Sequence, residues 1–148
     1  MTKQEVHTAV VEEIQHRLQR LNQTLSETTI SMQNETKSSA GDKHETARAM
    51  AQLEQEKLGQ QIHVTQTLYG ILDQLNPSDT HETIQFGSLV QLDDQWYYFS
   101  TGIGKIRVGE ETVFCLSIVT PLGKIVSGKK VGDHLEFNGK QQRITTVV

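Results

Sequence analysis

The chain has 148 residues, of which 35% are hydrophobic and 5% aromatic, and its formal net charge is −4. The acidic balance disfavours a general nucleic-acid-binding surface, and the low hydrophobic content favours an extended helical part joined to a compact unit over a single globule. After Met1 the sequence is polar, and no apolar run approaches the ~18 residues that a membrane span requires. The single cysteine, Cys115, excludes an internal disulfide. These features together favour a reducing, cytoplasmic location.

A long helix is predicted from about Val6 to Thr36. Its apolar residues recur at intervals of three or four, and Thr28 fills the one gap. Such a narrow stripe is typical of a coiled-coil seam. The stripe consists of Val6, Val10, Ile14, Leu18, Leu21, Leu25 and Met32.

A second helix is predicted from about Asp42 to Leu75, and Pro77 ends it because proline disfavours helical geometry at the preceding residue. Two helices of similar length with a short turn between them pack antiparallel. We therefore predict a coiled-coil hairpin over residues 1–76, with its tip at about 38–45. The expected stripe of the second helix is Ala47, Met50, Leu53, Leu58, Ile62, Leu68, Leu72 and Leu75.

Residues 77–82 are predicted to form a linker, and residues 83–148 a small antiparallel α+β domain. The hydrophobic period changes there from helical to alternating, which predicts strands. Thr120 and Pro121 are typical of a helix start, and Asn138-Gly139 is typical of a tight hairpin turn. Gly102 to Lys105 is predicted to be a loop. The expected elements are strands 89–92, 95–101 and 112–119, a helix from 121 to about 127, and strands 134–137 and 143–148.

Three blocks of sequence resemble the Gre family of bacterial transcript-cleavage factors, which includes GreA and GreB. The first is Gly41-Asp42-x-x-Glu45-x-Ala47, at the predicted tip. The second is the entry strand Phe86-Gly87-Ser88-Leu89-Val90. The third block runs from Ser117-Ile118-Val119-Thr120-Pro121-Leu122-Gly123 to Gly128-Lys129-Lys130-Val131-Gly132-Asp133. The resemblance extends over nearly the whole chain.

This resemblance implies an FKBP-like fold for the second domain, which would dock at the secondary channel of RNA polymerase. The hairpin would pass down that channel, and Asp42 and Glu45 would help to hold a Mg²⁺ ion shared with the polymerase active site. The polymerase would then cleave the 3′ end of a backtracked nascent RNA. The chain would be a transcription elongation factor and not an enzyme in its own right. It would be a monomer without membrane contact, and would bind no cofactor when isolated.

Several alternatives remain open at the tip. Asp42 and Glu45 also form a capping box, in which each side chain accepts a hydrogen bond from the other residue's backbone amide. Lys37, Lys43 and Arg48 either contact RNA phosphates or belong to an ordinary solvated surface. The tip is formally neutral, which weakens attraction of Mg²⁺ and favours a channel-binding regulator or inhibitor without cleavage. The charges that balance are three acids, Glu35, Asp42 and Glu45, and three bases, Lys37, Lys43 and Arg48.

Two further alternatives concern the second domain and the chain as a whole. Leu122 and Ile125 either contact the polymerase or, with Val126, pack their helix on the sheet. A coiled-coil interaction protein unrelated to transcription is the remaining possibility.

Overall fold

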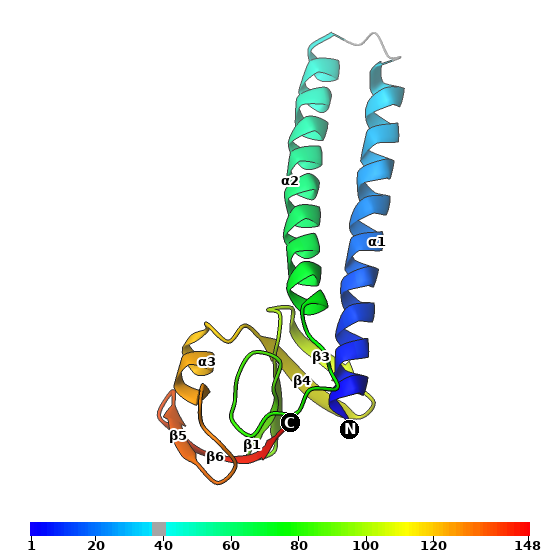
Figure 1. Ribbon diagram of the computed structural model, residues 1–148. Coiled ribbons are helices and arrows are strands. Elements are labelled where there is room, and N and C mark those ends of the chain that lie inside the picture. The colour runs from blue at the N-terminus through cyan, green and yellow to red at the C-terminus, as the bar shows by residue number, and fades with distance from the viewer. Residues whose placement is uncertain (37–40) are drawn as a thin grey trace. The chain divides into compact units, whose positions relative to one another are not determined.

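The structure, a computed structural model, describes residues 1–36 and 41–148 (Figure 1). Two long helices are followed by six strands and one short helix, which confirms the predicted α+β class. The elements are α1 (Lys3–Thr36), α2 (Gly41–Asp73), β1 (Leu89–Leu92), β2 (Gln95–Phe99), β3 (Gly104–Val108), β4 (Glu111–Leu116), α3 (Pro121–Val126), β5 (His134–Phe137) and β6 (Lys140–Val147).

Contacts divide the chain into two compact units. The first unit comprises residues 1–14 and 68–148, and the second comprises residues 15–67, which we call the arm. The first unit thus includes the beginning of α1 and the end of α2 together with the sheet. Val6, Val10, Ile14 and Leu72 are fully buried in this unit. The expected linker at 77–82 lies inside the first unit.

In the arm, the predicted stripe of α1 is confirmed, whereas that of α2 is partly wrong. Leu18, Leu21 and Leu25 are half-buried on α1. On α2, Met50 and Leu53 are 66% and 65% exposed. Toward the N-terminus from buried Leu58, the residues that face α1 follow at intervals of three or four. They have smaller or polar side chains. The seam residues of α2 are His44, Ala47, Ala51, Gln55, Leu58, Ile62 and Thr65.

A hydrogen bond between two side chains crosses this seam. Gln55 Nε2 donates to Thr29 Oγ1 at 3.0 Å, so a polar pair joins α1 and α2 where a coiled coil more often has two apolar side chains. Apolarity alone therefore selected Met50 and Leu53 wrongly, because the seam at those turns of α2 is built from small and polar residues. The predicted seam residues Ala47, Leu58 and Ile62 are confirmed.

The first unit contains a six-stranded sheet in the order β3-β4-β2-β1-β6-β5. β2 and β4 are parallel, and the other neighbouring pairs are antiparallel. The prediction of a purely antiparallel domain is therefore wrong, since alternation of apolar residues does not distinguish the two pairings. Part of the predicted loop 102–105 is also wrong, because β3 begins at Gly104 and pairs with β4.

The hydrophobic core of the first unit lies between α3 and the sheet. Its members are Ile84, Val90, Leu92, Phe99, Leu122, Val126, Leu135 and Ile144.

Two local predictions in this unit are confirmed. Thr120 is the N-cap of α3, with its Oγ1 accepting from the amide of Gly123 at 3.2 Å, and Pro121 follows it. Asn138 and Gly139, which join β5 to β6, have φ values of 53° and 76°. Positive φ at both positions is the requirement of a type I′ hairpin turn, which these residue types favour.

Candidate functional site

The predicted acidic residues lie at the beginning of α2. Asp42 and Glu45 are the second and fifth residues of this helix, which starts at Gly41. Residues three apart lie on the same side of a helix, and the unpaired amides of a helix N-terminus favour carboxylates. This placement is compatible with both capping and metal binding. Glu45 is exposed to solvent.

The structure describes two of the three basic residues that were predicted at the tip. Lys43 and Arg48 are exposed on α2, and Lys37 lies outside the described residues. Among the side chains that the structure describes, which do not include those of residues 35–42, no group of three His, Cys, Asp or Glu is arranged to hold a metal ion. Mg²⁺ takes about six oxygen ligands, so a metal bound by two carboxylates would need further ligands.

His44 is a polar residue of the tip that sequence reasoning did not select. It is half-buried, and its Nδ1 is buried without a hydrogen-bond partner in the part of the chain that the structure describes. The available signal was its position, because His44 precedes Ala47 by three residues in the seam of α2. This histidine belongs to the packing between the helices and not to the exposed charged surface.

A second candidate site is an apolar groove of about 240 Å³ next to α3. The ring of Tyr97 forms its floor, stacked against Phe114 with centroids 5.8 Å apart and against Phe99 with centroids 6.3 Å apart. Burial raises the pKa of the Tyr97 hydroxyl. The groove is suited to an apolar side chain of a partner. Its lining residues are Tyr97, Phe114, Leu116, Thr120, Pro121, Leu122 and Phe137.

The predicted contact residues of α3 differ in their exposure. Leu122 is 5% exposed and belongs to the hydrophobic core, so it packs the helix on the sheet, and it also lines the groove. Ile125 is 38% exposed and lies outside the lining. Val126 is fully buried and packs with Leu122. Sequence reasoning placed Tyr97 in a strand without identifying it as part of a groove.

Three titratable side chains gather where α1 meets the sheet, within the first unit. His7 Nδ1 lies 2.8 Å from the hydroxyl oxygen of Tyr98, and Lys3 Nζ donates to the carbonyl of Val148 at 3.2 Å. His81 Nδ1 lies 2.8 Å from Ser88 Oγ. The contacts of His7 and Lys3 attach the first turns of α1 to Tyr98 of β2 and to Val148, whereas the contact of His81 lies between the end of α2 and β1.

Burial is the main influence on the ionisation of this group. It lowers the pKa of Lys3, and Asp79 opposes the change. It also lowers the pKa values of His7 and His81, while Asp73 and Asp79 respectively act in the opposite direction. The cluster therefore favours neutral histidines. None of its members was selected from the sequence.

Comparison with solved structures finds a chain that is similar over nearly its whole length. No family model matches the chain, and no curated protein matches it. The solved structure is that of the transcription factor Gfh1, which is 23% identical to this chain. The match covers 94% of this chain and 93% of that one, with a TM-score of 0.38. Among the described residues, no helix is long and apolar enough to cross a membrane.

Proposed function

We propose that this chain is a transcription factor that binds RNA polymerase and inserts the arm into the secondary channel. The observation that carries the proposal is the position of Gly41-Asp42-x-x-Glu45-x-Ala47, which begins α2, the second helix of the arm. Residues 15–36 of α1 belong to the arm, and this part of the helix is about 33 Å long at 1.5 Å per residue. A slender helical element suits entry into a narrow channel, with the motif at the start of its second helix.

The proposed activity is stimulation of the cleavage of backtracked nascent RNA by the polymerase itself. Mg²⁺ takes oxygen ligands and keeps several waters, so one or two added carboxylates are sufficient to bind it beside ligands from the polymerase. Such an ion supplies charge stabilisation and a more acidic water for phosphodiester hydrolysis. Asp42 and Glu45 would provide those carboxylates and orient the water, and Lys43, Arg48 and Lys37 would contact RNA phosphates.

The apolar groove beside α3 is the proposed contact with the body of the polymerase. Its lining includes three aromatic side chains, Tyr97, Phe114 and Phe137, and aromatic pockets are typical of anchor sites. Ile125, exposed on the same short helix, would extend this contact. The chain would thus be an accessory factor with two separate points of attachment.

A second candidate function is that of a regulator or inhibitor that occupies the channel without promoting cleavage. The exposure of Lys43 and Arg48 favours it, since two cations beside Glu45 reduce the attraction of the tip for Mg²⁺. Binding of polymerase is common to both functions.

Transcript shortening in stalled, backtracked complexes separates these functions. We expect wild type to accelerate shortening, whereas Asp42→Asn and Glu45→Gln bind the polymerase and do not accelerate it. Glu54→Gln is the matched control, since Glu54 is an exposed acid of α2 away from the tip. Binding without acceleration by wild type would establish the regulator instead, and absence of binding would refute both functions.

The docking contact has its own test. Ile125→Asp should weaken polymerase binding without unfolding the domain, because the side chain is exposed. Gln141→Asp, at an exposed position of β6, is the control that adds the same charge. Equal binding by the two variants would place the docking surface elsewhere.

A further inference from the structure

The outer face of α2 in the arm carries apolar side chains that its own chain does not cover. Met50, Leu53 and Val64 are 66%, 65% and 57% exposed. They recur at intervals compatible with one side of a helix, away from the seam that contacts α1. Apolar residues repeated in this way on a helix are typical of a second packing surface.

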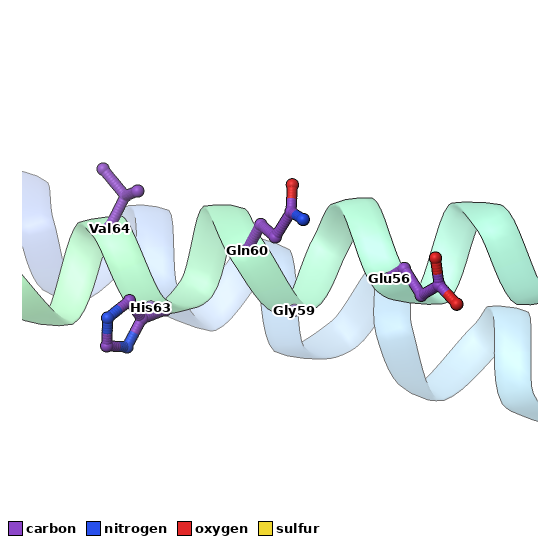
Figure 2. Close-up of a pocket in the computed structure, with 5 residues that line it drawn as sticks. All are labelled: Glu56, Gly59, Gln60, His63 and Val64. Carbon is purple, nitrogen blue, oxygen red and sulfur yellow. The ribbon is translucent and has the colours of Figure 1, made fainter.

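A hollow lies next to this face of α2 and shares Val64 with it. Its lining residues are Glu56, Gly59, Gln60, His63 and Val64, and Figure 2 shows Gly59 between Glu56 and His63, with no side chain at that point. The spacing of the first four is i, i+3, i+4 and i+7. That is the set of positions that surrounds an inserted side chain in a coiled coil.

Gly59 has no role in the packing of its own chain. A Cβ atom added there would meet nothing within 4 Å, and glycine is unfavourable in a helix interior. A glycine in such a place permits close approach of another helix.

We propose that the outer face of α2 binds the same face of a second copy of this chain, with the two α2 helices antiparallel, in a form distinct from the one that inserts a free arm into the polymerase channel. A twofold axis near residues 56 and 57 places Leu53 of one copy opposite Gln60 of the other, over the hollow beside Gly59. By symmetry, the second Leu53 enters the first hollow. Both apolar side chains and both hollows are thereby used, as an isologous interface requires.

The same register places Met50 opposite His63 of the other copy and pairs further residues around the face. Glu56 lies opposite Lys57 of the other copy, so the interface contains two ion pairs related by symmetry. Val64 lies opposite Ala49, a large residue against a small one. This complementarity of the face with itself identifies a second copy as the partner.

The first test is the oligomeric state of the full chain, measured by sedimentation over a range of concentrations. We expect wild type to form dimers, and Leu53→Lys to raise the dissociation constant by at least about tenfold, as loss of a central anchor does. Gly59→Leu should have the same effect because it fills the hollow. Gly70→Ala is the control, since it changes another glycine of α2 with nothing within 4 Å and should leave dimerisation unchanged.

Charge exchange tests the register. Glu56→Lys and Lys57→Glu each place like charges opposite each other and should weaken the dimer, whereas the double variant restores both pairs and should recover it. A wild-type chain that remains monomeric at all concentrations would overturn the proposal. So would a dimer that Leu53→Lys and the single charge variants leave intact. If Leu53→Lys weakened polymerase binding in a monomeric chain, the face would serve that partner and self-association would be refuted.

Discussion

His7 Nδ1 and the hydroxyl oxygen of Tyr98 lie 2.8 Å apart, and this contact joins the second turn of α1 to the centre of the sheet. The two rings meet edge to face, with centroids 6.2 Å apart. Tyr98 is fully buried, so its hydroxyl depends on this partner for a hydrogen bond. The contact links the base of a long helix to a strand 91 positions later in the chain.

The stability of the protein should fall on acidification because of this junction. Burial lowers the pKa values of His7 and His81 below 6.5, so the unfolded chain binds protons before the folded one does. Stability contributed by the neutral histidines is complete above 6.5 and is lost as the pH falls from there toward the lowered values. Thermal unfolding at a series of pH values between about 8 and 5 would measure this loss.

Replacement of the two histidines should reduce that pH dependence. His7→Gln combined with His81→Gln removes both titrating groups and keeps polar side chains opposite Tyr98 and Ser88. His16→Gln, at an exposed position of α1, is the control. An unchanged slope of stability against pH in the double variant would show that other groups determine it.

Loss of the α3 cap should destabilise the first unit. Thr120 Oγ1 accepts from the amide of Gly123 and donates to the carbonyl of Ser117 at 2.7 Å. Thr120→Ala should therefore lower the free energy of unfolding by about 1 kcal/mol, the usual cost of an N-cap. Chemical denaturation would measure the change, and Thr120→Ser should retain most of the stability because it keeps the hydroxyl.

Gly123 should tolerate no side chain. A Cβ atom there would overlap the carbonyl oxygen of Ile118 and lie 2.6 Å from its carbonyl carbon, and backbone atoms cannot move aside cheaply. Gly123→Ala should lower the free energy of unfolding by about 3 kcal/mol or more. In Gly102→Ala the added atom meets nothing within 4 Å, so that variant is the control in the same denaturation experiment. Similar effects of the two changes would refute the close approach.

The revised seam of α2 can be tested with two matched leucines. Leu58 is 4% exposed and Leu53 is 65% exposed. Leu58→Ala should lower the free energy of unfolding by about 2–5 kcal/mol, whereas Leu53→Ala should change it by no more than about 0.5 kcal/mol. Unfolding measured at low protein concentration, to limit self-association, would distinguish them. A larger effect at Leu53 than at Leu58 would show that Leu53, and not Leu58, packs in the seam.

Much of the fold could be predicted where local chemistry determines it. The period of α1, the cap at Thr120 and the turn at Asn138-Gly139 each depend on residues within a few positions of one another. The seam of α2 depends on which face α1 covers, and there Ala51 and Gln55 lie in the seam while the more apolar Met50 and Leu53 are exposed. Hydrophobicity alone does not contain that information.

The candidate sites also divide into features that local sequence determines and features that depend on contacts between distant segments. The start of α2 was predicted to within one residue, because a helix N-terminus has a local signature in the sequence. The roles of Asp42 and Glu45 stay predictions. The groove at Tyr97 and the contact between His7 and Tyr98 depend on pairings between distant segments. Parallel pairing of β2 with β4 is of this kind as well, since the same alternation serves both strand directions.

The neighbours of β1 have a consequence for the order in which the protein folds. β1 pairs with β2 across a two-residue turn, but also with β6, where Gln91 contacts Thr145, 54 residues away in sequence. The chain is synthesised from its N-terminus, and contacts distant in sequence form slowly. We therefore expect α1 and α2 to form while half of the sheet is still missing. During that interval Val90 and Gln91 of β1 lack their partner strand, and a nascent chain paused before β6 would present an unpaired strand edge that is prone to aggregation.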